Sequence, residues 1–244
     1  LFDMKFINQI LIIFTFLGLN ACQVIEDDSD PPSIEIENVP SAIAANNNCS
    51  AGVYKGVMGS NSGYFKISIK NGSELVMCDF VFDGKPTTLT SFSLTDWDPG
   101  QPVNGAVFTG MWDGKLITLI FSCDTNGKNL QISVSVPGHD IMYVSIFKET
   151  SETLVKCYEG TYTYSKGSES IEGNWNFIIY GNLMIGYHSD IERNGFITGT
   201  LSGTILTLGD SALGNKLTVN DMNITGYFKD KDGKTIVVTG KRSL

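Results

Sequence analysis

The chain has few of the residues on which nucleic-acid-binding sites depend. Its 244 residues include 17 lysines and arginines against 26 aspartates and glutamates, which gives a formal net charge of −9. A surface with this balance and no basic cluster does not attract nucleic acid or anionic lipid head groups. We therefore expect no nucleic acid among its partners.

Metal-binding and redox motifs are also scarce. The two histidines, His139 and His188, are far apart and have no cysteine or carboxylate at ligand spacing, and none of the five cysteines forms a C-x-x-C pair. Metal sites in proteins usually show short, regular ligand spacings. We expect no metal and no cofactor, and interpret both histidines as surface or turn residues.

Helical periodicity is missing, and alternation takes its place. Apolar and polar residues alternate over 65–70 and 130–136, which is the period of half-buried strands. Dipeptides that favour tight hairpin turns separate such runs: Asn71-Gly72, Asp83-Gly84, Asp113-Gly114, Asn126-Gly127, Asn194-Gly195 and Asp232-Gly233. The pattern predicts about sixteen short strands in an all-β antiparallel meander barrel or sandwich.

An internal similarity predicts two similar halves. Residues 109–119 resemble residues 198–208, and Cys49-x-x-Gly52-x-Tyr54 parallels Cys157-x-x-Gly160-x-Tyr162. Chance agreement among Gly/Thr-rich strands is the alternative. We expect halves at 49–150 and 151–244, with the boundary near Glu149-Thr150-Ser151-Glu152.

The first residues have the pattern of an export signal. Met4-Lys5 precedes an apolar run over 10–19, and Leu1-Phe2-Asp3 is expected to precede the translation start. The run is too short for a permanent transmembrane helix, which needs about 20 apolar residues. We predict a signal peptide over 1–21.

The end of this run, Leu19-Asn20-Ala21-Cys22, resembles the lipobox of bacterial lipoproteins. The resemblance implies diacylglycerol on Cys22 and hence the membrane as a partner. An ordinary secretory cleavage site beside a chance cysteine is the alternative. Gln23 differs from the aspartate that marks inner-membrane retention in some Gram-negative bacteria, so we expect an outer-membrane lipoprotein.

An acidic segment follows the cysteine. Residues 23–48 carry six acidic and no basic residues, two adjacent prolines and the run Asn46-Asn47-Asn48. Because this composition is typical of linkers, we predict that 22–48 is a tether. Glu26-Asp27-Asp28-Ser29-Asp30 also resembles the surface-export signal of certain Gram-negative lipoproteins, which implies display at the cell surface. A solvated linker is the other interpretation.

Four further cysteines leave disulfides open. Cys49, Cys78, Cys123 and Cys157 are an even number in an exported chain, where disulfides can form. Their repeat and mid-strand positions favour the pairs Cys49–Cys157 and Cys78–Cys123. Free buried thiols are the alternative.

Motifs for catalysis or calcium are incomplete. The segment 209–213 resembles the nucleophile block of GDS-type lipases, but no histidine follows Ser211 to act as its base. Asp96-Trp97-Asp98-Pro99-Gly100 and Asp230-Lys231-Asp232-Gly233 lack the spacing of an EF-hand loop. We interpret all three as turns and expect that the protein is not an enzyme.

The three tryptophans are the candidate ligand-binding residues, because flat aromatic rings often stack on ligands. Trp97 lies in a polar, Pro/Gly-bounded loop and is expected to be exposed, whereas core packing is the alternative for Trp112 and Trp175. The Gly-x-aromatic pattern is similar to the first strand of lipocalin-like lipoproteins, although the aromatic here is Tyr54 or Tyr162 rather than tryptophan. That resemblance implies a small barrel with an aromatic closing one end.

Three functions fit these features. The first is a non-enzymatic binding module for a glycan, a small apolar ligand, a lipid or a protein of the envelope. The second is a structural or assembly lipoprotein that contacts other envelope proteins, and the third is an exported hydrolase. An aromatic-lined pocket would favour the first, a broad apolar patch the second, and a buried carboxylate pair the third.

Overall fold

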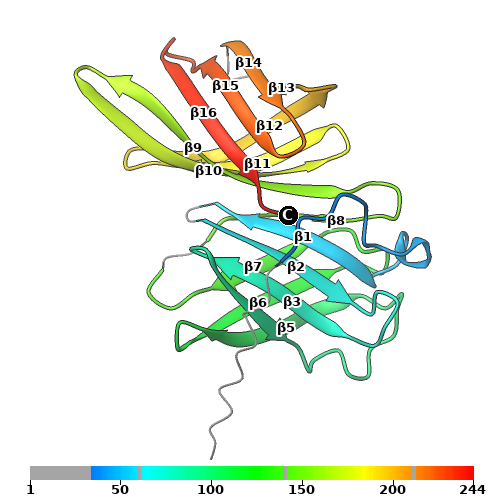
Figure 1. Ribbon diagram of the computed structural model, residues 1–244. Helices are drawn as coiled ribbons and strands as arrows, with labels where there is room; N and C mark the ends of the chain where they lie inside the picture. Colours follow the sequence, from blue (N-terminus) through cyan, green and yellow to red (C-terminus); the bar gives the residue numbers. More distant parts are fainter. Residues whose placement is uncertain (1–33, 60–61, 140–141, 210–212) are drawn as a thin grey trace, which may run out of the picture. The chain divides into compact units, whose positions relative to one another are not determined.

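The computed structural model describes residues 34–59, 62–139, 142–209 and 213–244 (Figure 1). The predicted signal peptide, Cys22, the acidic cluster and the Ser211 motif lie outside the described residues. The described residues fall within one compact unit.

The described residues form sixteen strands and one short 3₁₀ turn, so the prediction of an all-β fold is confirmed. The elements are η1 (Ala44–Asn46), β1 (Gly52–Met58), β2 (Gly63–Ile69), β3 (Val76–Phe82), β4 (Lys85–Thr90), β5 (Val103–Trp112), β6 (Lys115–Cys123), β7 (Gln131–Ser135), β8 (Val144–Lys148), β9 (Val155–Lys166), β10 (Glu169–Tyr180), β11 (Leu183–Ser189), β12 (Asn194–Ser202), β13 (Ile205–Leu208), β14 (Leu213–Val219), β15 (Asn223–Lys229) and β16 (Thr235–Arg242).

The first eight strands form one antiparallel sheet, here called the N-terminal sheet. Its order is β7-β6-β5-β4-β3-β2-β1-β8, a meander in which β8 returns to pair with β1. Phe65, Ile67 and Ile69 of β2 point into its core because alternate residues of a strand face opposite sides. The rings of Tyr54 and Phe121 pack in this core with centroids 4.7 Å apart.

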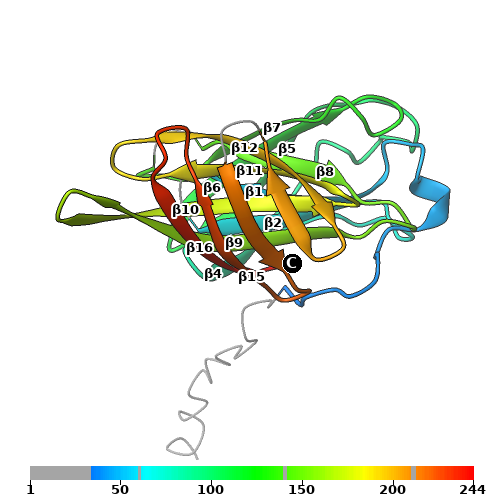
Figure 2. The same cartoon turned by 90° about the horizontal axis from the view of Figure 1, so that it is seen from above.

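The last eight strands form a closed barrel, here called the C-terminal barrel. Its order is β10-β11-β12-β13-β14-β15-β16-β9, and the pairing of β16 with β9 closes it. Viewed from above, β9, β15 and β16 run side by side (Figure 2). Tyr158, Phe177, Leu206 and Leu217 are buried within one core cluster of the barrel. A barrel of eight strands has an interior that side chains fill or that holds one small ligand.

The two sheets share a meander order, as the expected two halves require. The internal sequence similarity, however, matches equivalent strands of the two sheets only in part. Cys49-x-x-Gly52-x-Tyr54 runs into β1, and Cys157-x-x-Gly160-x-Tyr162 lies on β9, the first strand of each half. Residues 109–119 and 198–208, however, fall on β5–β6 and β12–β13, which differ by one place in strand order. Both hairpins turn at a glycine with positive φ, Gly114 and Gly203. We attribute this second match to common turn chemistry.

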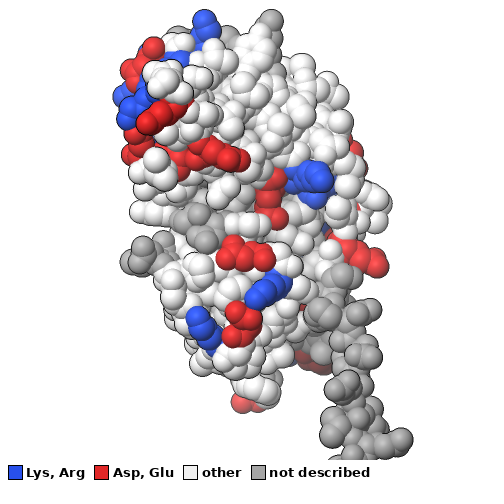
Figure 3. Space-filling model, turned by 60° about the vertical axis from the view of Figure 1, so that its left-hand side comes forward, with Lys and Arg blue, Asp and Glu red and all other residues white. Residues whose placement is uncertain are grey.

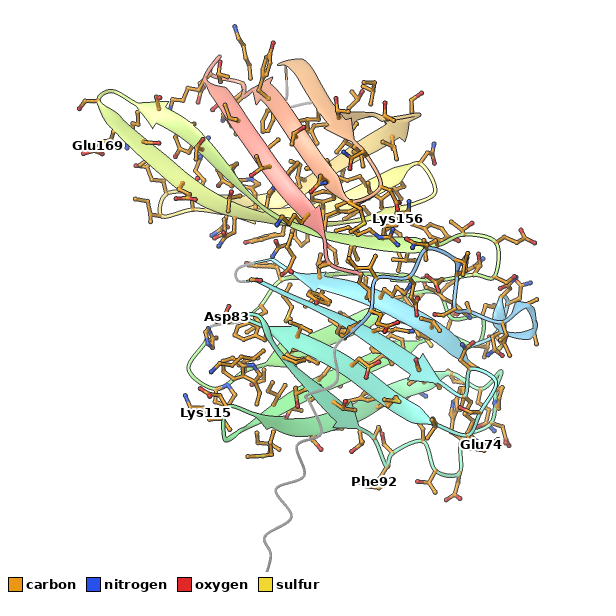
Figure 4. The ribbon with its side chains drawn as sticks, in the orientation of Figure 1. Glu74, Asp83, Phe92, Lys115, Lys156 and Glu169 are labelled. Atoms are coloured by element: carbon orange, nitrogen blue, oxygen red, sulfur yellow. The ribbon has the colours of Figure 1, made fainter. Side chains whose placement is uncertain are left out.

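The Asn-Gly and Asp-Gly dipeptides form turns with one exception. Asp83 and Gly84 have φ of 46° and 72°, as a two-residue hairpin turn requires, and Figure 4 shows Asp83 at the end of its hairpin. The prediction of a turn at Asn194-Gly195 is wrong, because both residues lie in β12. The turn comes earlier, where Asp190 Oδ1 accepts the backbone N–H groups of Glu192 and Arg193.

The predicted tether is also partly wrong, because residues 34–48 pack against both sheets; we call this segment the N-terminal strap. Lys55 of β1 is fully buried, and its Nζ lies 2.6 Å from Glu149 and 2.7 Å from Glu37 of the strap. The carbonyl oxygen of Glu37 accepts a hydrogen bond from Arg242 of β16. An acidic residue of the strap thus neutralises a buried lysine, which is why composition alone misleads here.

Residues 149–154 connect β8 to β9, and β1 contacts both β9 and β10. Asn176 Nδ2 of β10 donates to the carbonyl oxygen of Met58 at 2.6 Å. Val57, Cys157 and Ile178 meet in a small apolar cluster between these strands. The contacts between the sheets therefore include both apolar packing and a buried hydrogen bond.

Candidate functional site

The C-terminal barrel has a cavity of about 660 Å³ at one end, within the range of roughly 300–1,000 Å³ of small-molecule sites. Its lining residues come from six strands and two loops: Tyr162, Trp175, His188, Glu192, Arg193, Asn194, Phe196, Ile197, Phe228, Asp230, Lys231, Asp232, Ile236 and Val238. Sequence reasoning singled out Trp175 and Tyr162, but not their meeting in one cavity.

The base of the cavity is apolar. Ile236 and Val238 of β16 alternate with exposed residues, so both point into the barrel. Trp175 of β10 is buried beside them, and its Nε1 donates to the carbonyl oxygen of Thr239 at 3.1 Å. Because the indole N–H is already satisfied, this base presents carbon atoms to a ligand.

The mouth of the cavity lies between two loops that Arg193 links. Its Nη1 is 3.2 Å from Oδ2 of Asp230 in the β15–β16 loop, and its Nε is 3.5 Å from Oδ2 of Asp190 in the β11–β12 loop. The guanidinium also lies 4.1 Å from the ring centroid of Tyr164. Two carboxylates and one ring thus hold a single cation at the rim. Figure 3 shows charged side chains of both signs gathered at the top of the molecule in that view.

Three polar side chains form a chain of contacts inside the rim. The Tyr162 hydroxyl donates to Asp190 Oδ2 at 2.6 Å and lies 3.4 Å from Nδ1 of His188. Burial raises the pKa of Asp190, but the hydrogen bonds from Tyr162 and two backbone N–H groups outweigh it and leave that pKa below its usual value. Burial and the hydrogen bond to Asp190 raise the pKa of Tyr162. Tyr162 is therefore a hydrogen-bond donor rather than a base.

His188 is a neutral side chain of the cavity wall. It lies on β11, half-buried, on the same inward face as Met184 and Gly186. Burial, together with the charge of Arg193, lowers its pKa below the usual value of 6.5. The interpretation of His188 as a surface or turn residue is wrong. The alternation of residues 184, 186 and 188 on one face of the strand is the sequence pattern that could have predicted an inward-facing His188.

A glycine keeps space open beside this histidine. Gly195 of β12 pairs with His188 of β11, and a Cβ built on it would meet Nε2 of His188 at 3.4 Å and no other atom of a described residue beyond its chain neighbours within 4 Å. Its φ is not positive, so a larger residue would fit the backbone. The glycine that resembled a turn residue in the sequence instead leaves room in the cavity wall.

Exposed apolar side chains flank the mouth. Ile191 in the β11–β12 loop is 85% exposed and Phe196 of β12 is 62% exposed. On the outer face of the barrel the ring of Phe196 meets those of Tyr143 and Tyr187, which stack with centroids 4.5 Å apart. An apolar ligand that approaches this end would meet carbon surface before it reaches the charged rim.

The tryptophans do not form a common ligand platform. The prediction that Trp97 is exposed is wrong, because it is 7% exposed and packs in the core of the N-terminal sheet. Its loop folds inward since Gly100 N donates to Ser50 Oγ and the Trp97 indole donates to the Pro102 carbonyl oxygen. Trp112 is also buried, with its ring against Phe82. Trp175 alone of the three lines the described cavity.

The four cysteines of the described residues are free thiols, the alternative to the two predicted disulfides. Cys157 lies in the cluster between the sheets, whereas Cys49 packs against the core of the N-terminal sheet, so the two belong to different clusters. Burial raises the pKa of Cys157 to about 12 and raises that of Cys78, so neither is poised as a thiolate nucleophile.

The acidic turn motifs are turns in the structure as well. Asp230 Oδ1 accepts the backbone N–H groups of Asp232 and Lys234, which uses that oxygen within its own loop. In the part of the chain that the structure describes, no group of three His, Cys, Asp or Glu residues is placed to hold a metal ion. No helix among the same residues is long and apolar enough to cross a membrane.

Among its described residues the cavity holds little that could catalyse acyl transfer. Its described lining contains no serine, threonine or cysteine, and its tyrosine is a donor to a carboxylate. The arrangement suits recognition of a molecule with an apolar body and a small polar group. Searches of family models, curated proteins and solved structures find no match to this chain.

Proposed function

We propose that this protein is an envelope-anchored lipoprotein whose C-terminal barrel captures a small molecule without chemical conversion. The cavity of about 660 Å³, with its apolar base and charged rim, carries the proposal. Capture is favoured over hydrolysis because the Tyr162 hydroxyl donates to Asp190 and no activated nucleophile faces the cavity among the described residues.

The anchor in this proposal rests on the lipobox resemblance at Leu19-Asn20-Ala21-Cys22. Lipid on Cys22 would hold the barrel at the outer membrane, with display at the cell surface implied by the acidic cluster that follows. A membrane-held capture protein would work on molecules that arrive at the envelope.

A second candidate is assembly with another envelope protein. Val107 and Ile120 are cross-strand neighbours on β5 and β6, as are Met111 and Leu116, and all four are exposed. They form an apolar stripe on the outer face of one hairpin. Such a stripe is typical of a protein contact, but it offers no enclosed volume for a small ligand.

Filling the cavity tests capture. The full chain in detergent micelles is titrated with N-phenyl-1-naphthylamine, a neutral apolar dye, and energy transfer from tryptophan to the dye is measured because Trp175 lines the cavity. Gly195→Leu places a side chain beside His188 and should abolish the cavity-dependent transfer. Thr200→Leu adds the same side chain at an exposed position of β12 and should leave it unchanged.

The two variants also separate the candidates. Equal transfer in wild type, Gly195→Leu and Thr200→Leu would show that the dye sits in micelles alone, and capture would be rejected. If, in addition, Met111→Ser removes an envelope protein that co-purifies with the wild-type chain, assembly becomes the better proposal.

A further inference from the structure

The neighbouring side chains determine where the hydroxyl proton of Tyr162 points in the cavity wall. Asp190 is ionised, its Oδ2 lies 2.6 Å from the Tyr162 oxygen, and a carboxylate can only accept. The hydroxyl proton of Tyr162 therefore points at Asp190. The remaining lone pairs of the Tyr162 oxygen are left to face His188.

This arrangement selects the tautomer of His188. Its Nδ1 lies 3.4 Å from the Tyr162 oxygen, which has no second proton to give, so Nδ1 carries the hydrogen and donates. A neutral imidazole has one N–H, and its other nitrogen accepts. Nε2 of His188 is therefore an acceptor, and it is the atom that faces the open space at Gly195.

The charged groups of the rim bear on the charge of the ligand. Nε of Arg193 is buried and makes no hydrogen bond within the described residues, being 3.5 Å from the nearest carboxylate oxygen. The cavity lining holds two cations, Arg193 and Lys231, against three carboxylates, Glu192, Asp230 and Asp232, so negative charge is in excess and an anionic ligand is disfavoured. A neutral polar group is better suited to this rim.

The apolar base sets the rest of the ligand. Trp175, Ile236 and Val238 offer no free hydrogen-bonding group, so a molecule with hydroxyls on every side would lose hydrogen bonds to water there. This favours a mostly apolar body over a glycan.

Building on the proposed capture function, we infer that the ligand is a neutral, mainly apolar molecule with a hydroxyl or amide N–H that donates to Nε2 of His188. The hydroxyl of an alcohol meets this requirement. His188 is then the residue that selects the ligand, and Tyr162 and Asp190 are positioning residues that set its tautomer.

Displacement of N-phenyl-1-naphthylamine from the full chain by three molecules with alkyl chains of nearly equal length tests this inference. 1-Decanol carries a donor, 1-methoxydecane carries an acceptor alone, and decanoate carries a charge. We expect decanol to displace the dye at about a tenfold lower concentration than the other two, the ratio of one buried hydrogen bond. This comparison in the wild-type chain needs no variant to fold.

Two variants place the effect on His188. His188→Phe keeps a ring but loses the acceptor. The concentration of decanol that displaces the dye should therefore rise about tenfold, while that of methoxydecane stays unchanged. His188→Gln supplies an amide oxygen and should restore part of the preference for decanol. Asp190→Asn should reduce the preference too, because the Tyr162 proton is then free to turn toward His188.

Different results would reject the inference and the proposed capture function. Equal displacement by all three molecules would leave capture standing and reject the inference, and so would the tightest displacement by decanoate. If Gly195→Leu does not alter dye binding, the proposed capture function itself fails.

Discussion

Arg193 and Asp230 join two loops that are not neighbours in the barrel. Their Nη1–Oδ2 distance is 3.2 Å, and they lie on the β11–β12 and β15–β16 loops, with β13 and β14 between them in strand order. One ion pair thus spans the mouth of the cavity. Asp230 also holds its own turn, because its other oxygen accepts two backbone N–H groups.

Removing the charge of Asp230 should loosen this end of the barrel. Asp230→Asn keeps the turn acceptor but leaves Arg193 with one carboxylate, and we expect a loss of about 1–2 kcal/mol in the free energy of unfolding. Urea denaturation measures it. Asp113→Asn, in the exposed pair with Lys85, is the matched control and should lower the free energy of unfolding far less, because solvent screens an exposed pair. Equal effects would mean that the Arg193 link adds nothing.

The buried ion pair of Lys55 and Glu149, beneath the N-terminal strap, should contribute more to stability than the pair of Arg193 and Asp230. Lys55 and Glu149 are fully buried, and Glu149 Oε1 also accepts the backbone N–H of Ser41. Lys55→Met leaves a buried carboxylate without its cation and should cost about 3–5 kcal/mol. Chemical denaturation of the full chain tests this, with Lys70→Met as control because its partner Glu74 is exposed. A smaller loss of stability in Lys55→Met than in Lys70→Met would contradict the role of this ion pair beneath the strap.

Stability should fall on mild acidification through His188. Its pKa is lowered in the folded chain, so between the unfolded value of about 6.5 and the folded value the unfolded state binds the extra proton. Lower pH in this window therefore favours unfolding, and protonation also removes the Nε2 acceptor. The groups that face His188 are Tyr162, Asp190 and Arg193.

The measurement is the melting temperature between pH 8 and pH 5. The wild-type chain should lose stability below about pH 6.5, and His188→Phe should flatten that part of the curve. The carboxylate of Asp190, whose pKa is lowered, contributes stability that is lost at more acidic pH, so the two steps separate. An unchanged curve in His188→Phe would show that His188 is not the group that titrates.

Trp97 should behave as a core residue. Trp97→Ala removes a side chain that packs with Leu94 and Val103, and we expect a loss of about 3–5 kcal/mol in stability with dye binding in the C-terminal barrel unchanged. Phe92→Ala, at a position that is 85% exposed, should change stability by less than about 0.5 kcal/mol. Figure 4 shows Phe92 in the loop that follows β4, at the bottom of the view. A loss of dye binding in Trp97→Ala at unchanged stability would restore it as a ligand residue.

The lipid anchor is tested at Cys22. Cys22→Ser should abolish incorporation of labelled fatty acid and leave the precursor uncleaved, because the thioether cannot form on serine. Cys49→Ser, at a cysteine outside the lipobox, should still be labelled. Labelling of Cys22→Ser, or none in the wild-type chain, would reject the lipoprotein assignment.

The sequence alone determined the strands and most of the turns. Alternation over 65–70 and the Asp83-Gly84 dipeptide act within a few residues, since side-chain period and positive φ are local properties of the backbone. They predicted the sixteen strands and the all-β class without reference to any distant residue.

Only the tertiary structure decided where the site lies. The closure of the barrel by β9 and β16 joins residues about 80 positions apart, as in the pair Tyr162 and Val238, and no local pattern encodes it. The same holds for Trp97, whose polar loop is drawn into the core by Ser50, and for Glu37, whose charge meets a buried lysine. The same closure encloses the cavity beside which Tyr162 of β9 contacts His188 and Asp190 at the end of β11.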